Sequence, residues 1–381
     1  MKKLPLLLSL LLCVALNACS NCGNKWGNLL SAADADSTKT QDSIGKFGPN
    51  GNAPAEVSLA FVGDVMMGTN FPDSSYITKD RGRSLFKDCA PYIKAADLAI
   101  ANLEGTMYYG TEGELRKMTN PKTYYIFRMP GDHAQNLVDA GFDAVGIANN
   151  HSNDFGITGR KLTLANLRSV GLGVSGVKEM AEECLIERNG VTFGFLQFAA
   201  ACTNTLDLNN EAEVKQYVTA LRKKCDVLIV TFHGGAEGTA YLHVPMAEET
   251  YVGERRGNVA KFARLCVDLG ADIVVGHGPH VPRGMEIYKN HLIAYSLGNF
   301  CTPFRMGVSG TKGLAPLLVA RVRTDNGAFA GGQIHSYRQQ ERIGPRTDST
   351  NEAARLINQL SQADFPQSAP AISPEGVISP K

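Results

Sequence analysis

Polar side chains that can bind metals and move protons follow five apolar segments of this 381-residue chain. The set contains carboxylates, amides and imidazoles: Asp64, Glu104, Asn149, Asn150, His151, His233, His277 and His280. In open α/β sheets, ligands gather at the carboxyl ends of the strands. If the apolar segments are strands, these side chains therefore lie close together.

Each of these residues also has an ordinary explanation. A single Asp after a strand often caps a helix, a single Asn often forms a turn, and a single His is often a hydrogen-bonded structural residue. These explanations become strained over five sites that hold four of the eight histidines. Oxygen and nitrogen ligands without sulfur favour Mn, Fe or Zn, so we predict one or two divalent metal ions.

Such a site suits hydrolysis at a phosphoryl centre. Two metal ions about 3.5–4 Å apart can hold the oxygens of that centre and activate a water. Glu104 is the natural bridging carboxylate, and Asn150 would add a neutral ligand. His151 could protonate the leaving group, because an imidazole titrates near working pH.

Short apolar runs alternate with helical patterns between about residue 56 and residue 342. The expected strands are 57–63, 97–103, 144–148, 193–199, 226–232, 272–276 and 291–297. Amphipathic helices are expected at 211–224 and 258–269, where apolar residues recur at i, i+3, i+4 and i+7. This alternation predicts a layered α/β fold with strands covered on both faces. Residues 105–130 are aperiodic and rich in tyrosine, and they could be either a lid or a plain surface loop.

The two ends of the chain differ from this body. Two lysines precede an apolar run at 4–16, and the segment at 16–19, "LNAC", resembles a bacterial lipobox. We expect residues 1–18 to be a lipoprotein signal peptide and Cys19 to be lipidated, the alternative being an ordinary cleaved signal peptide. Residues 19–55 are then a flexible tether, and the protein is a membrane-anchored lipoprotein of the cell envelope facing the periplasm or exterior. Residues 343–381 are expected to form a short helix and a disordered Pro- and Ser-rich tail.

Composition excludes several classes of protein. The formal net charge is +1 and the body has no basic tract, so no nucleic-acid surface is expected. With Cys13 and Cys19 assigned to export, seven cysteines remain without a repeated spacing. A disulfide framework or a zinc knuckle is therefore not expected.

Five stretches between about 57 and 300 carry a family resemblance. They are "FVGDVMMG", "LAIANLEG", "FRMPGDHAQNLVDAGFDAVGIANNHSNDFGITG", "VTFHGGAEG" and "GADIVVGHGPHVPRGMEIYKNHLIAYSLGNF". In this order they resemble the bacterial capsule synthesis family of poly-γ-glutamate biosynthesis, which is related to calcineurin-like metallophosphoesterases.

The resemblance implies a four-layer α-β-β-α sandwich with its metal site at the carboxyl ends of the strands. It implies that His151 is the catalytic acid and that the metal ligands are Asp64, Glu104, Asn150, His233, His277 and His280. Arg128, Asn149 and Glu237 are expected to contact the substrate, although Arg128 could equally be a surface arginine.

The chain departs from the phosphoesterase pattern at three points. Met66 stands where a histidine ligand is expected, the last histidine pair is H-x-x-H instead of H-x-H, and Gly234 replaces an aromatic residue. From the resemblance, we expect the first two departures to be common to the capsule family. They weaken the inference to phosphoesterase chemistry and make a one-metal or weakly held two-metal site plausible.

Three functions are compatible with these residues. The first is a metal-dependent hydrolase of phosphoester-like bonds in capsule or exopolymer metabolism, with an anionic polymer or a phosphoester as substrate. The second is a non-catalytic anchored subunit of a polymer synthesis or export complex at the membrane. The third is a metal-dependent hydrolase or transferase acting on the amide bonds of a γ-glutamyl polymer, since a metal-bound water can also attack a carbonyl.

Overall fold

A computed structural model describes residues 54–116, 125–200 and 202–380. The expected signal peptide, the lipidation site at Cys19 and nearly all of the expected tether lie outside these residues. Among the described residues, no helix has the length and apolar character needed to cross a membrane. Their cysteines form no disulfide bonds, and Cys225 and Cys266 are buried.

The first sheet has β1 (Glu56–Val65) near its centre, between antiparallel β17 and parallel β2. Its strands run in the order β20 (Ala371–Ile372), β21 (Val377–Ser379), β18 (Phe329–Gln340), β17 (Leu314–Arg323), β1, β2 (Leu98–Leu103), β5 (Ala144–Gly146) and β6 (Gly173–Ser175). In addition, β16 (Asn299–Cys301) pairs with β1, and β19 (Gly344–Thr347) pairs with β18.

The second sheet contains the parallel pair β10 and β13, which carry histidines at their ends. Its order is β14 (Met285–Tyr288), β15 (His291–Ala294), β13 (Ile273–His277), β10 (Val227–His233), β8 (Val191–Ala199) and β7 (Glu183–Arg188), with β9 (Leu206–Asp207) on β8. Two small pairs lie apart from the two sheets: β3 (Thr106–Met107) with β4 (Arg128–Met129), and β11 (Glu249–Tyr251) with β12 (Glu254–Gly257).

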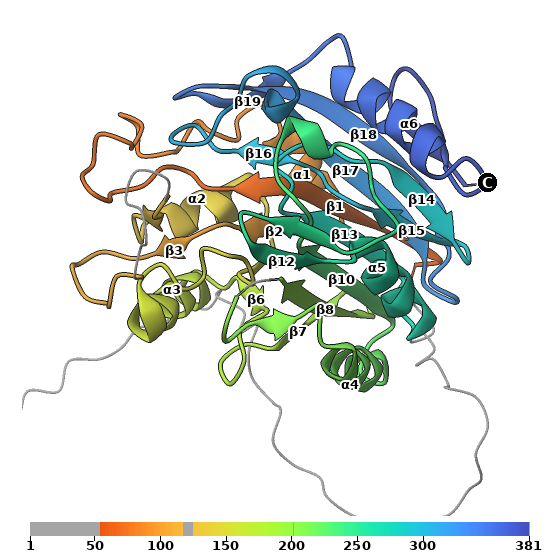
Figure 1. Ribbon diagram of the computed structural model, residues 1–381, viewed down its shortest axis with the longest axis horizontal. Helices are drawn as coiled ribbons and strands as arrows, with labels where there is room; N and C mark the ends of the chain where they lie inside the picture. The colour runs from red at the N-terminus through yellow and green to blue at the C-terminus, as the bar shows by residue number, and fades with distance from the viewer. Residues whose placement is uncertain (1–53, 117–124, 201, 381) are drawn as a thin grey trace, which may run out of the picture. The chain divides into compact units, whose positions relative to one another are not determined.

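Helices cover the outer faces of both sheets (Figure 1). The first sheet packs against α1 (Ala90–Ala95), α2 (His133–Ala140) and α3 (Gly156–Ser169). The second packs against α4 (Glu211–Arg222) and α5 (Val259–Asp268). Short 3₁₀ turns occur at η1 (Thr239–Tyr241) and η2 (Gly310–Gly313).

A separate apolar core fills the space between the sheets. Along β1, Leu59 and Phe61 belong to this inner core, whereas Ala60 and Val62 belong to the core beneath α1–α3. The alternation follows from the two-residue period of a strand and explains why β1 is apolar on both faces. The expected four-layer α-β-β-α sandwich is therefore confirmed.

The structure of the C-terminal segment differs from the one expected from the sequence. Residues 343–381 were expected to form a short helix and a disordered tail. The expected helix is present as α6 (Glu352–Asp364), but β19 precedes it and the segment after it forms β20 and β21. Ala354 and Ile357 of α6 are buried in the core between the sheets, and the β20–β21 hairpin extends the first sheet from β18. The domain therefore continues well beyond residue 342. Buried apolar side chains at helical spacing in α6 stabilise this segment, although its Pro- and Ser-rich composition is typical of disorder.

Candidate metal centre

The strand ends of both sheets bring the expected residues together. In the first sheet, Asp64 of β1 is in register with Asn102 of β2, and Glu104 comes directly after β2. In the second sheet, His233 of β10 is in register with His277 of β13. These parallel strands all end on the same side, as expected for a ligand site in an α/β sheet.

Asp64, Glu104 and His280 form the centre of the cluster. One ligand atom from each of these residues lies within 4.8 Å of the others. His280 Nδ1 is 2.9 Å from Asp64 Oδ2, and His280 Nε2 is 3.6 Å from Glu104 Oε1. His277 Nδ1 is 3.5 Å from Asp64 Oδ1.

The backbone of His280 supports a functional role. Its φ of 58° lies in the left-handed region, which non-glycine residues seldom adopt. Such conformations concentrate at active sites and ligand-binding sites, although ten other non-glycine residues among those described also have a positive φ.

Several polar atoms of the cluster are buried without a hydrogen-bond partner among the described residues. They are Glu104 Oε1 and Oε2, His233 Nε2, His277 Nδ1 and Asn150 Oδ1. Buried polar atoms are normally paired, because leaving one unsatisfied costs about 1–3 kcal/mol. This group of unpaired carboxylate, imidazole and amide atoms is a suitable ligand set for a divalent cation of hard or borderline character.

Burial and mutual charge shift the pKa values of the cluster in opposite directions. Burial raises the pKa of Glu104 well above its usual value and lowers that of His233. Burial also opposes ionisation of Asp64, but its close contacts with the His277 and His280 imidazoles outweigh this effect and lower its pKa. Burial lowers the pKa of His280, but the charge of Glu104 and the bond to Asp64 raise it overall to about 10. The raised pKa values of Glu104 and His280 favour the protonated forms of these two groups. A metal ion would have to displace those protons to bind the same atoms.

His151 faces this cluster from the turn after β5. Its Nε2 is 3.8 Å from Glu104 Oε1, and its Nδ1 is 2.9 Å from Asp154 Oδ2. Asp154 is itself fixed, because it accepts a 2.8 Å bond from the backbone N–H of Phe127 and lies 3.2 Å from Arg116. With Nδ1 held by a carboxylate, Nε2 is the nitrogen available for proton transfer. This geometry agrees with the predicted role of His151 as an acid.

Asn149 and Asn150 have different surroundings. The Asn149 amide group donates to Asn102 Oδ1 (3.2 Å) and the Leu103 carbonyl (2.8 Å), and its oxygen accepts from the His151 N–H (3.1 Å). Asn149 is fully buried and shapes the turn, and its expected contact with substrate remains a prediction. Asn150 has an open, buried amide oxygen, but its membership of the ligand set remains a prediction.

Glu237 and Arg128, the other two residues expected to contact substrate, lie in different surroundings. Glu237 lies at the edge of the cluster, where its Oε2 is 3.9 Å from His280 Nε2 and its Oε1 is 2.8 Å from Arg256. Arg128 donates to Asn70 Oδ1 (2.7 Å) and lies 5.0 Å from the centroid of the Phe155 ring. Neither contact joins Arg128 to the described residues of the metal cluster, so its role in binding substrate remains a prediction.

Three residues that support the site had no such role in the sequence interpretation. Asn102 Nδ2 donates to Asp64 Oδ1 (2.8 Å), and Gln197 Nε2 donates to Asn102 Oδ1 (3.0 Å). Asp154 orients His151 through the contact of its Oδ2 with His151 Nδ1. The i, i+3 spacing of His151 and Asp154 was the available signal for this pair. Gln197 comes from the second sheet and carried no signal.

One of the departures from the phosphoesterase pattern has a steric reason. A Cβ on Gly234 would come within 2.8 Å of Leu208 and 3.0 Å of the Arg256 carbonyl. Its N–H also donates to the His277 carbonyl (2.8 Å). The close approach of these segments excludes the aromatic side chain.

The fold and the site together define the metallophosphoesterase-like class: a four-layer sandwich with acidic and imidazole side chains at its strand ends. Residues 58–303 match the family described as bacterial capsule synthesis protein PGA_cap, and the chain belongs to this family.

Curated relatives carry related names. The chain is 30% identical over 294 residues to the "PGA biosynthesis protein CapA" of Bacillus subtilis (strain 168), which covers 72% of this chain and 70% of the relative. It is 30% identical over 290 residues to the "Capsule biosynthesis protein CapA" of Bacillus anthracis, covering 71% and 65%.

Solved structures are more distant. One described as a novel phosphatase of Mycoplasma pneumoniae has a TM-score of 0.48 and 16% identity, with 77% of this chain and 95% of that chain covered. A hypothetical protein from Thermus thermophilus has a TM-score of 0.45 and 17% identity, with 74% and 99% covered.

Proposed function

We propose that this protein is a metal-dependent hydrolase of phosphoester-type bonds that acts in the synthesis of a capsule or other exopolymer. One observation carries the proposal. Both carboxylate oxygens of Glu104 are buried without hydrogen-bond partners among the described residues, and Oε1 lies 3.6 Å from His280 Nε2 and 3.8 Å from Nε2 of His151, the histidine held by Asp154. The names of the Bacillus relatives support a role in poly-γ-glutamate capsule synthesis.

The residues divide into a binding group and a proton-transfer group. Asp64, Glu104, His233, His277 and His280 would hold one or two divalent ions of Mn, Fe or Zn, with Asn150 as an added ligand. When bound, such an ion polarises a phosphoryl oxygen and makes a water more acidic.

The chain itself supplies a directed proton and a fixed geometry. Asp154 holds Nδ1 of His151, so that Nε2 points toward the cluster and can pass a proton to a leaving oxygen. Asn149 fixes the turn through the His151 N–H, and Asn102 fixes Asp64. Positioned acids of this kind contribute about 10²- to 10⁴-fold to a rate.

The test is direct. The protein is purified without chelators, its metal content is measured by elemental analysis, and hydrolysis of an aryl phosphate is followed. We expect Mn, Fe or Zn to be present and the ester to be cleaved. A protein that retains no metal would exclude this function.

A second function is favoured by Met66, which is fully buried where a phosphoesterase would have a further histidine ligand. In this case the protein is a non-catalytic subunit of a polymer synthesis or export complex, anchored to the cell envelope through Cys19. Export that survives His151→Ala but is lost with Cys19→Ala would support this function. Loss of export with His151→Ala, at normal protein levels, would support the enzyme.

A further inference from the structure

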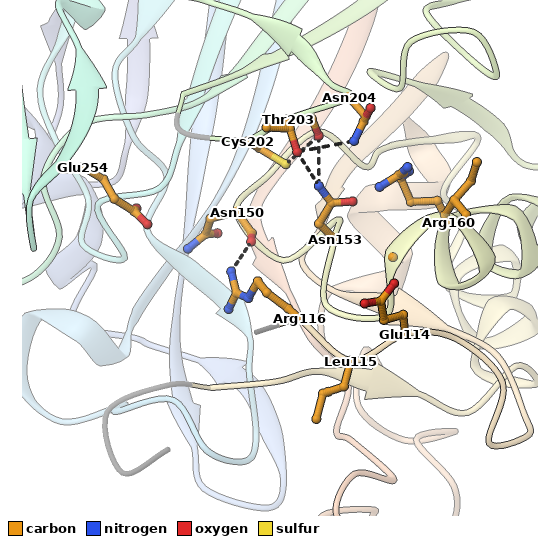
Figure 2. A pocket seen from close by; sticks show the side chains of 12 residues that line it. Glu114, Leu115, Arg116, Asn150, Asn153, Arg160, Cys202, Thr203, Asn204 and Glu254 are labelled. Carbon is orange, nitrogen blue, oxygen red and sulfur yellow. Dashed lines mark hydrogen bonds between the residues drawn. The ribbon is translucent and has the colours of Figure 1, made fainter. Parts of the chain in front are cut away.

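A cavity of about 540 Å³ opens beside the turn that carries His151. Its wall includes Asn150, Asn153 and Arg160, together with residues of the segments 114–116 and 202–204 (Figure 2). Its volume is within the range of cavities that bind small molecules, so it can admit a segment of a chain as well as a single anionic group. Because Asn150 directly precedes His151, the cavity borders the proposed reaction site.

Arg160 is an unusual residue in this wall. It lies on α3 and is only 6% exposed, yet it forms no hydrogen bond or ion pair with any described residue. Its Nε is buried, and no described residue hydrogen-bonds to it. Figure 2 shows its guanidinium group pointing into the cavity. Buried arginines are almost always paired, since an unpaired buried charge is costly.

The other charges near the cavity do not neutralise Arg160. Arg116 is occupied by Asp154 (3.2 Å) and by the Asn150 carbonyl (2.9 Å). Glu254 is paired with Arg256 at 3.0 Å, and Glu114 is an exposed residue. Glu114 and Glu254 line the same cavity, but among the described residues neither carboxylate forms an ion pair with Arg160. Burial lowers the pKa of Arg160 from its very high usual value, which reflects the same cost.

We propose that this cavity binds an oxyanion of the substrate, a carboxylate or a phosphate, through the guanidinium group of Arg160. The proposal rests on the proposed function and narrows it: the substrate is an acidic chain with one anionic group beside the scissile bond. A guanidinium group suits this role because its planar N–H donors match the two oxygens of such a group. Arg160 would then set specificity while His151 transfers the proton.

The experiment measures binding without turnover. The full-length protein is freed of metal with chelator and titrated calorimetrically with two probes, a short γ-linked glutamate oligopeptide and inorganic phosphate. Arg160→Gln is compared with Lys161→Gln, which removes the same charge from the exposed neighbouring position on α3. We expect Arg160→Gln to weaken binding of at least one probe by tenfold or more, and Lys161→Gln to change it less than twofold.

The probe that depends on Arg160 identifies the anion. Dependence of the oligopeptide alone indicates a carboxylate, and dependence of phosphate indicates a phosphoryl group. If Arg160→Gln binds both probes as tightly as the wild type, or if the wild type binds neither, the proposal is overturned.

Folding is controlled by the thermal midpoint and by Arg160→Lys. Removing an unpaired buried cation should leave the midpoint unchanged or higher, and Arg160→Lys should weaken binding less than Arg160→Gln. If the thermal midpoint falls and Arg160→Lys binds the probes as weakly as Arg160→Gln does, Arg160 has a structural role instead. Binding is measured on metal-free protein without turnover. A protein that proves to have no hydrolase activity could therefore still bind the anion through Arg160, and a protein that fails to bind the anion through Arg160 could still be a hydrolase.

Discussion

Replacing Glu104 with glutamine should stabilise the metal-free protein and abolish its stabilisation by metal. In the part of the chain that the structure describes, neither buried oxygen of Glu104 has a hydrogen-bond donor, a situation that costs about 1–3 kcal/mol for a buried acceptor. The uncharged amide of Glu104→Gln removes the ionised form that burial disfavours. Part of the gain is offset by the lost attraction to His280, whose Nε2 is 3.6 Å away. We therefore expect a net gain of about 1–2 kcal/mol in the free energy of unfolding at pH 7.

The pH dependence has a definite sign. Burial raises the pKa of Glu104 above its unfolded value, so its contribution to stability is greatest below about pH 4.3 and is lost as the pH rises toward the raised value. Each pH unit in that window removes up to about 1.4 kcal/mol. The metal-free wild type should thus lose more stability between pH 5 and pH 8 than Glu104→Gln does.

With metal bound, the wild type should become more stable than Glu104→Gln. A metal at about 100 times its Kd stabilises the folded state by about 2.7 kcal/mol, and its affinity increases with pH because the ligands must lose protons. Urea unfolding in chelator and in Mn²⁺ or Zn²⁺, at pH 5, 6, 7 and 8, measures these effects. Glu249→Gln is a matched control, since both oxygens of Glu249 are buried and paired with Arg283 at 2.9 and 2.8 Å. It should destabilise the protein by about 3–5 kcal/mol with or without metal.

Two results would refute this reasoning. One is a Glu104→Gln protein that is less stable than the wild type in chelator across the whole pH range. The other is a Glu104→Gln protein that gains as much stability from metal as the wild type does.

Two further changes test the supporting residues. Asp154→Asn should lower kcat about 10- to 100-fold and shift the pH profile, with metal content unchanged, because the carboxylate that orients His151 is lost; loss of metal instead would place Asp154 in the ligand set. Ile357→Ala should lower the free energy of unfolding by about 2–5 kcal/mol in urea, because this side chain of α6 is buried between the sheets. A change below about 0.5 kcal/mol would mean that the C-terminal segment does not stabilise the domain.

The sequence was informative about the site because its chemistry lies at strand ends. Asp64, Glu104, His233, His277 and His280 each follow or end an apolar run, and parallel strands bring such ends to one edge. All seven expected strands are present, although their bounds shift by a few residues and β5 ends at Gly146 instead of residue 148.

Other features depend on contacts between distant segments, which a local pattern does not reveal. Gln197 reaches Asn102 from the other sheet, 95 residues along the chain. Arg160 resembles any arginine on a polar helix until its burial is known. The antiparallel strands β17 and β18 were not expected, and together with α6 they complete the side of the domain where a disordered tail was predicted. Whether residues 105–130 form a lid or a plain surface loop is not tested, since residues 117–124 lie outside the described part of the chain.

The most direct test of the central claim compares the wild type with His151→Ala at equal metal content. Both proteins are purified without chelators, their metal is measured by elemental analysis, and aryl phosphate hydrolysis is followed under saturating substrate. We predict that both hold the same amount of Mn, Fe or Zn and that His151→Ala turns over about 10²- to 10⁴-fold more slowly. Equal turnover by the two metal-loaded proteins would contradict the assignment of His151 as the acid, and the absence of metal from both would contradict the metal centre itself.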